Sequence, residues 1–443
     1  MKKIDIDNLS PAQILSLGYL TVIIVGTILL SLPIATASGQ AMNPLDALFT
    51  ATSATAVTGL IVENTATFFS TFGQVVIMIL IQIGGLGLMT MSTLFAFLIK
   101  KKLTLKYRLM VQQDLDQFEL SGIIRLVRYV VFVTFTIEAT GALLLFTRFI
   151  REMPVGRAAY YAIFHAVSAF NNAGFDIFGN SLENFTGDIT VNLVITALFI
   201  LGGIGFAVIA EIHSGKRFRD FSLQTKLVLA VTAILIVGST VVVFVLEYTN
   251  PATLMDLSLG EKALSSYFTA VTPRTAGFNT LPTGNLRDST IFFVIVLMFI
   301  GASPGSTGGG IKTTTFGSLL TVLYSKARGK EDIELFKRRL SKQTIYTAVT
   351  VVSISAFLVF VITMLLTISE NAPFIDLLFE AVSAFGTVGL STGVTPELTT
   401  VGRMLIIITM FAGRVGPLTI AMAIGEQDIK GNVKYPKEKI LVG

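Results

Sequence analysis

Eight long apolar segments dominate the chain and set its expected architecture. They cover about residues 14–34, 72–99, 122–147, 190–211, 226–247, 289–324, 343–368 and 400–425, and polar and glycine residues interrupt the sixth. Because a helix of about 20 apolar residues spans the hydrocarbon core of a bilayer, the pattern predicts an all-α polytopic membrane protein. The first segment is 21 residues long, longer than the apolar region of a signal peptide, so we expect it to be retained as a membrane helix.

A shorter apolar stretch lies between the two segments of each successive pair. Every one of these stretches contains the pattern F-x-A-x-[ST], and a glycine follows ten residues after the phenylalanine, or nine in the third copy. Irregular backbone at membrane depth is tolerated only inside protein or against a watery cavity. We therefore expect four repeats of helix, pore loop and helix. The phenylalanines are Phe49, Phe164, Phe268 and Phe379, and the glycines are Gly59, Gly174, Gly277 and Gly389.

The distribution of lysine and arginine gives the expected topology. Segments on the side of the N-terminus hold 24 of the 33 basic residues, whereas the opposite side holds only 6. The positive-inside rule then predicts that both termini are cytoplasmic and that all four loops enter from outside. The repeats are therefore parallel, which favours a pseudo-fourfold arrangement around one central pore over the inverted repeats of many secondary transporters. Their expected bounds are residues 1–115, 116–220, 221–335 and 336–443, the last with a cytoplasmic tail.

The three residues that end at each glycine form a candidate cation filter. Thr387, Val388 and Gly389 follow the T-V-G order of potassium-channel filters, whose carbonyl oxygens replace the water around an ion. Glycine permits the dihedrals that turn carbonyls toward one axis, and the preceding short helix would direct its negative end there. A simple helix cap explains one such glycine, but four copies in register favour the filter. The predicted filter residues are Val57, Thr58, Gly59, Asn172, Ala173, Gly174, Thr275, Ala276, Gly277, Thr387, Val388 and Gly389.

Small residues recur in the later helix of each repeat, at positions 84–87, 202–205, 301–304 and 413–416, where they allow close packing or a bend. In the third repeat they open into a glycine-rich segment, residues 301–314, which is a candidate gate below the filter. Arg414 is a costly charge at membrane depth. We expect it to contact this segment and form an electrostatic barrier to cations, or else only to bind its carbonyls. The predicted gate residues are Gly301, Ala302, Ser303, Pro304, Gly305, Ser306, Thr307, Gly308, Gly309, Gly310, Lys312 and Arg414.

The composition argues against several other classes of protein. The chain is 52% hydrophobic and 14% charged, unlike an average soluble domain. Cysteine is absent, and His165 and His213 form no metal-ligand motif, while an extra isoleucine breaks the spacing of a phosphate-binding loop at 305–312. We expect no enzymatic activity, no tightly bound cofactor and no nucleic-acid partner. His165 and Glu380 occupy equivalent positions in their short helices, and we expect both to make buried structural hydrogen bonds.

These motifs resemble the membrane subunit of the bacterial Ktr potassium-uptake systems, within the Trk/Ktr/HKT superfamily. The resemblance covers residues 13 to about 425 and rests on the four glycines and the interrupted third repeat. It implies channel-like potassium uptake across the plasma membrane, with potassium ions bound at the filter residues only. Members with serine at the first filter glycine favour sodium, and Gly59 is intact here. The resemblance also implies a gate at 301–314 with Arg414 as its partner, a homodimer, and a cytosolic nucleotide-binding ring that controls opening; sodium activation is common among relatives.

The residues leave two other functions open. A sodium-coupled solute symporter would hold its substrate at the broken helix of the third repeat, although parallel repeats argue against it. A scaffold that only anchors a cytosolic complex would have no use for four filters. A membrane potential of 100 mV contributes about 2.3 kcal/mol per monovalent cation, so passive uptake needs no ATP-hydrolysing motif. The expected docking surfaces for a regulatory ring are segments 100–120, 326–342 and the tail from 426.

Overall fold

The computed structural model describes residues 11–87, 90, 123–215, 217–330, 332–416 and 419, and this part of the chain is mainly helical. The prediction of a mostly helical protein with several apolar helices is confirmed. One small exception is a hairpin in which β1 (Glu334–Leu335) pairs with β2 (Arg338–Arg339). The predicted docking segment 100–120 and the tail from 426 lie outside the described residues.

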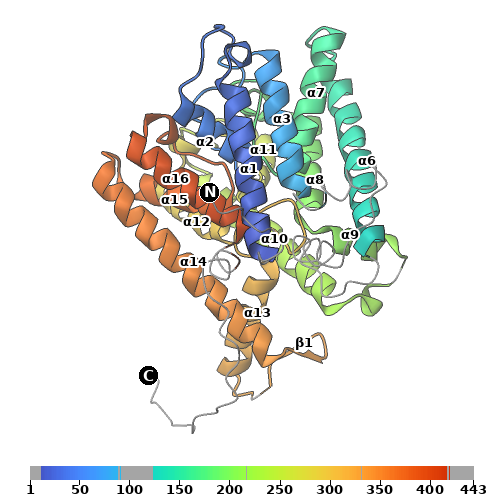
Figure 1. The fold of residues 1–443 in the computed structure, drawn as a ribbon. Helices are drawn as coiled ribbons and strands as arrows, with labels where there is room; N and C mark the ends of the chain where they lie inside the picture. Colours follow the sequence, from blue (N-terminus) through green and yellow to red (C-terminus); the bar gives the residue numbers. More distant parts are fainter. Residues whose placement is uncertain are drawn as a thin grey trace, which may run out of the picture.

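Each quarter of the chain contributes a long helix, a short helix and a later helix (Figure 1). The first two quarters contain α1 (Pro11–Ser31), α2 (Pro44–Thr55) and α3 (Thr71–Leu86), then α6 (Ile123–Phe149), α7 (Val155–Phe170), α8 (Ile189–Gly203) and α9 (Phe206–His213). The last two contain α10 (Leu223–Glu247), α11 (Leu259–Val271), α12 (Asp288–Phe299) and α13 (Thr313–Ala327), then α14 (Lys342–Ser369), α15 (Phe374–Gly386) and α16 (Thr400–Val415).

The long helix of each quarter has the length and composition of a membrane span. The four spans that meet this description are Gln13–Ser31, Val127–Phe149, Leu223–Glu247 and Lys342–Ser369. Their outer faces carry large exposed apolar side chains such as Phe132, Val245 and Phe360. A continuous apolar exterior of this kind suits contact with lipid rather than water.

The later helices of the first, second and fourth quarters differ from the prediction, because within the described residues each one ends or bends at its small-residue segment, whereas the interruption of the third was predicted. The continuous span predicted over 190–211 is wrong: α8 and α9 meet at an angle of 99°. Helices α3 and α16 end at the equivalent positions, and in the third quarter the helix stops after α12 and resumes at α13. The glycines at the first, second and fourth breaks have φ angles outside the helical range. They are Gly87 at 85°, Gly205 at 93° and Gly416 at 91°.

The short helices α2, α7, α11 and α15 lie inside the bundle. Local chemistry fixes where they begin: the Asn43 side chain accepts the Leu45 N–H at 2.9 Å ahead of α2, and Ser258 and Glu261 form a capping box at α11. The phenylalanine of each F-x-A-x-[ST] pattern packs completely inside the protein, which explains its recurrence. These residues are Phe49, Phe164, Phe268 and Phe379.

Helix contacts close the four quarters into a ring. Each later helix packs against the short helix of the next quarter, so α3 contacts α7, α8 contacts α11, and α12 contacts α15. The ring is completed where α16 packs against α2, and these two helices lie side by side in Figure 1. The segments that follow the four short helices are thereby brought together at its centre.

Candidate functional site

The four predicted filter glycines meet at the centre of this ring. A Cβ atom on Gly59 would lie 3.2 Å from the Gly174 Cα, and one on Gly174 would lie 2.9 Å from the Gly277 Cα. A Cβ on Gly277 would be 3.4 Å from the Gly389 Cα, and one on Gly389 would be 2.9 Å from the Gly59 Cα. Each glycine therefore touches the next, and the last touches the first. We refer to this arrangement of Gly59, Gly174, Gly277 and Gly389 as the glycine ring.

Backbone oxygens lie at the junctions of the glycine ring. The oxygen of Ala276 is 3.0 Å from the position that a Cβ would take on Gly174, and that of Val388 is 2.5 Å from the corresponding position on Gly277. One such carbonyl comes from each quarter, from the residue before each glycine. The four residues are Thr58, Ala173, Ala276 and Val388. Carbonyl oxygens gathered in this way are suited to replace the hydration shell of a monovalent cation.

The backbone on either side of these carbonyls repeats a rare conformation. The residue two before each glycine has a left-handed φ, which non-glycine residues seldom adopt. Alternation between left-handed and ordinary dihedrals turns successive carbonyls to one side, and rare conformations of this kind concentrate at functional sites. The four residues and their φ angles are Val57 at 57°, Asn172 at 59°, Thr275 at 66° and Thr387 at 51°.

The serine or threonine of each F-x-A-x-[ST] pattern ties the glycine segment to its short helix, a role that the sequence analysis missed. The hydroxyls of Ser53 and Ser383 accept the glycine N–H of their own quarters at 3.0 and 3.2 Å. Ser168 and Thr272 instead donate to the carbonyl of the residue after the glycine, at 2.7 and 2.5 Å. The fourfold recurrence of a hydroxyl residue was the available signal for this role.

We expect Ser383→Ala to lower the melting temperature of the purified protein by several degrees. The half-buried Gly389 N–H would lose its hydroxyl acceptor, and the full cost of an unsatisfied buried donor is about 1–3 kcal/mol. A fluorescence melt of the detergent-solubilised chain measures this effect. Ser214→Ala is the control, because that exposed hydroxyl bonds the Glu211 carbonyl one helical turn earlier and, among the described residues, makes no hydrogen bond to a glycine segment. Equal melting of Ser383→Ala and wild type would show that the hydroxyl does not hold the glycine segment.

The segment between α12 and α13, residues 300–312, is the interruption of the third quarter. It lies directly against three of the four glycine segments. Its contacts join Thr307 to Asn172, Gly308 to Thr275, and Gly309 to Thr387. The first is a hydrogen bond of 2.9 Å between the hydroxyl and the amide side chain. The third is a hydrogen bond of 3.0 Å from the Gly309 N–H to the threonine hydroxyl. The predicted position of the candidate gate beside the predicted filter is therefore present in the structure.

The same interruption is anchored to the bend between α8 and α9. The Ser303 N–H donates to the Gly203 carbonyl at 2.9 Å, and the Phe206 N–H donates to the Gly305 carbonyl at 2.8 Å. The break in the second quarter and the interruption in the third thus support each other. The remaining predicted gate residues of the interruption are buried or half-buried in it: Gly301, Ala302, Pro304, Ser306 and Gly310.

Arg414 links this interruption to the first quarter. Its guanidinium donates to the carbonyls of Thr307 and Gly84, while the Lys312 ammonium donates to the Gly308 carbonyl at 3.1 Å. The predicted contact between Arg414 and the candidate gate is therefore present. Among the residues that the structure describes, Arg414 forms no salt bridge, so backbone carbonyls rather than a carboxylate balance its charge.

Glu138 is a second residue that the sequence analysis overlooked. It is 4% exposed within the apolar helix α6 and accepts the Asn171 side-chain N–H at 2.9 Å. Asn171 also donates to Gln82 at 3.1 Å and directly precedes the predicted filter residue Asn172. A lone carboxylate in an apolar span was the signal that would have drawn attention to it.

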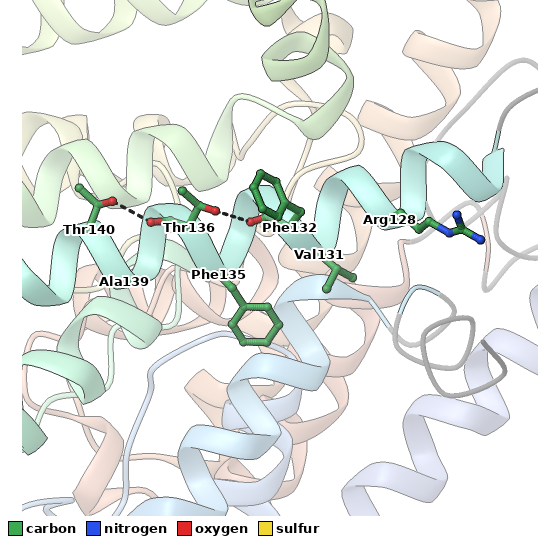
Figure 2. Close-up of a pocket in the computed structure, with 7 residues that line it drawn as sticks. All are labelled: Arg128, Val131, Phe132, Phe135, Thr136, Ala139 and Thr140. Carbon is green, nitrogen blue, oxygen red and sulfur yellow. Dashed lines mark hydrogen bonds between the residues drawn. The ribbon is translucent and has the colours of Figure 1, made fainter. Parts of the chain in front are cut away.

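The groove that Figure 2 shows along α6 is lined mainly by apolar side chains. Seven residues line it, among them Val131, Phe132, Phe135 and Ala139. The hydroxyls of Thr136 and Thr140 donate to carbonyls of the preceding helical turn at 2.8 Å, so they are satisfied within α6. The groove therefore has the properties of a lipid-facing surface. Within the described ranges, no group of three histidine, cysteine, aspartate or glutamate side chains is placed to hold a metal ion.

Comparison of this chain with known proteins identifies its relatives. Residues 10–429 match the family of cation transport proteins called TrkH. The Ktr system potassium uptake protein B of Bacillus subtilis is 47% identical over 98% of this chain and 97% of its own length. The potassium/sodium uptake protein NtpJ of Enterococcus hirae is 38% identical over 100% of this chain and 99% of its own length.

The fold is also similar to a solved structure. The crystal structure of the potassium transporter TrkH from Vibrio parahaemolyticus has a TM-score of 0.72 to this chain at 17% identity, and the match covers 93% of this chain and 85% of that one. At this identity the likeness concerns the fold alone. The family match and the near full-length relatives confirm the resemblance drawn from the sequence motifs, and this chain belongs to the TrkH family of cation transport proteins.

Proposed function

We propose that this chain is the ion-conducting subunit of a channel-like potassium uptake system in the plasma membrane. The observation that carries the proposal is the glycine ring, with one backbone carbonyl from each quarter at its junctions. Dehydration of potassium is offset when such oxygens replace its water. The names of near full-length relatives, which are potassium uptake proteins, support the choice of ion.

In this proposal residues 301–314 and Arg414 form the gate. Support comes from the contacts of Thr307, Gly308 and Gly309 with three of the four glycine segments. The guanidinium charge beside this segment would repel an incoming cation, because charges interact strongly where water is scarce. Opening would require the interruption to leave both the glycine segments and Arg414.

We further propose that a cytosolic nucleotide-binding ring controls this gate, that the chain forms a homodimer, and that both termini are cytoplasmic. The designation of relatives as parts of a Ktr system supports a separate component. The hairpin β1–β2, which follows α13 and projects from the bundle in Figure 1, is a suitable docking surface because Phe336, Arg338 and Arg339 are exposed. Any nucleotide would then bind the partner, and this chain would hold potassium ions only.

Uptake of potassium, rubidium and sodium by potassium-requiring cells that express the chain tests the proposal. We expect growth at low potassium and uptake of potassium and rubidium in clear preference to sodium. Cells with an empty vector give the background. Saturable, sodium-driven uptake of an organic solute without potassium uptake would instead favour a symporter, a reading that the named relatives do not support.

A further inference from the structure

The second position of the F-x-A-x-[ST] pattern is buried in all four quarters, but its side chain differs. Short threonines occupy it in the first and third quarters, and long hydrogen-bonding side chains occupy it in the second and fourth. The four residues are Thr50, His165, Thr269 and Glu380. The second and fourth quarters are not neighbours in the ring of helix contacts, so the two long side chains belong to opposite quarters.

Glu380 is completely buried on α15 and holds the backbone that leaves the glycine ring. One carboxylate oxygen accepts the Ser391 hydroxyl at 2.5 Å and the Thr392 N–H at 3.1 Å. The other oxygen accepts the Thr395 hydroxyl at 2.5 Å. Three donors from one short return segment, which begins two residues after Gly389, thus converge on a single side chain.

His165 makes the corresponding contact in the second quarter. Its Nδ1 lies 2.7 Å from the Tyr161 carbonyl, which leaves Nε2 to accept the Ile177 N–H at 3.4 Å. Ile177 and Thr392 each lie three residues after the filter glycine of their quarter. The ring of His165 also stacks on Phe178, with 4.4 Å between centroids. In two opposite quarters, therefore, a side chain of the short helix accepts the backbone N–H of the residue three after the glycine.

The threonines do not reproduce this contact. The Thr50 hydroxyl is buried and has no hydrogen-bond partner among the described residues. The return segment of the first quarter is therefore not held from this position. In all four quarters, by contrast, the serine or threonine of the pattern bonds either the glycine N–H or the carbonyl of the next residue.

We propose that Glu380 is a positioning residue that sets the potassium-over-sodium preference of the glycine ring, and that His165 has the weaker equivalent role in the opposite quarter. The inference rests on the proposed function. The segment held by Glu380 begins two residues after Gly389. The position of this segment therefore constrains the backbone carbonyls next to Gly389. Discrimination between two cations of equal charge depends on such carbonyl positions or on their stiffness. Two of the four quarters are thus braced through this position.

Glu380→Thr tests the proposal, because it installs the residue found in the first and third quarters, which is too short to reach the return segment. Rubidium and sodium uptake are measured in potassium-requiring cells, with protein amount determined by immunoblot. We expect the rubidium-over-sodium ratio to fall about tenfold in Glu380→Thr, equivalent to about 1.4 kcal/mol in relative cation binding. Glu380→Gln, which keeps an oxygen acceptor for Ser391 and Thr392, should retain most of the ratio. His165→Thr should lower it less than Glu380→Thr.

Glu370→Thr is the matched control. Glu370 also accepts three hydrogen bonds, from Ser369 at 3.0 Å and from the Thr399 hydroxyl and N–H at 2.6 and 2.9 Å. It ends α14 and holds Thr399, the N-cap of α16, so its bonds are not made to a segment that follows a glycine of the glycine ring. A wild-type ratio in Glu380→Thr, or an equal loss in Glu370→Thr, overturns the inference while leaving the proposed function intact. Absence of potassium uptake by wild type overturns the proposed function itself. If Glu380→Thr does not accumulate, Ser391→Ala and Thr395→Val decide: a lowered ratio supports the inference, and an unchanged ratio in both contradicts it.

Discussion

Gly59→Ser is expected to lower the preference for potassium over sodium by about tenfold or more, which corresponds to about 1.4 kcal/mol in relative binding. A side chain at this position would press against the Ala173 carbonyl and lie 3.2 Å from the Gly174 Cα. It would also have to adopt a φ of 96°, which L side chains rarely do. Both effects displace carbonyls of two adjacent quarters. Parallel uptake of rubidium and sodium measures the loss.

Gly39→Ser is the matched control for this experiment. Gly39 also has a left-handed φ, of 69°, but nothing lies within 4 Å of the position of its Cβ. It therefore reproduces the backbone strain without crowding the glycine ring. Normal selectivity in Gly39→Ser, together with a large loss in Gly59→Ser, would assign the effect to the ring. Unchanged selectivity in Gly59→Ser would mean that this glycine only ends its helix.

Arg414→Ala is expected to raise potassium uptake several-fold under conditions in which the wild type is closed. The substitution removes the positive charge beside the interruption and the bonds from Arg414 to the carbonyls of Thr307 and Gly84. Both changes favour an open path. Rubidium uptake at matched protein amounts provides the measurement, and Arg328→Ala, which removes an exposed charge at the end of α13, provides the control.

Arg414→Lys separates the two contributions, because lysine keeps the charge but lacks the two-pronged donor geometry. Uptake close to wild type in this variant would assign the barrier to charge, and uptake close to that of Arg414→Ala would assign it to the carbonyl bonds. Unchanged uptake in Arg414→Ala would remove the barrier hypothesis.

The sequence was sufficient for the features that depend on length and recurrence. The four long spans and the four buried short helices follow from apolar runs and from the repeated F-x-A-x-[ST] pattern. The meeting of four glycines more than 100 residues apart was predicted because identical positions in parallel repeats must lie at one depth. Hydrophobic patterning and repetition carry this information without tertiary detail.

The breaks in the later helices were predicted incompletely. Residues 190–211 are mainly apolar, and hydropathy does not register that Gly205 adopts a left-handed φ. The bend exists because the interruption of the third quarter donates and accepts backbone hydrogen bonds there, as between Phe206 and Gly305. Since that partner lies about 100 residues away, local sequence could not specify the bend.

Side-chain partners were the least predictable part of the site. Arg414 reaches the carbonyl of Gly84, 330 residues earlier in the chain, because ring closure places α16 beside the first quarter. The Ser53 hydroxyl accepts an N–H, whereas the equivalent Ser168 donates to a carbonyl, and the shared sequence pattern does not distinguish these two roles. Such differences arise from packing and not from the pattern itself.

Diffraction from crystals grown with rubidium or thallium in place of potassium tests the central proposal most directly, because both ions scatter anomalously. We expect an anomalous peak on the axis of the glycine ring, with the carbonyl oxygens of Thr58, Ala173, Ala276 and Val388 nearest to it. Anomalous peaks elsewhere in the protein, with none at the glycine ring, would contradict the proposal.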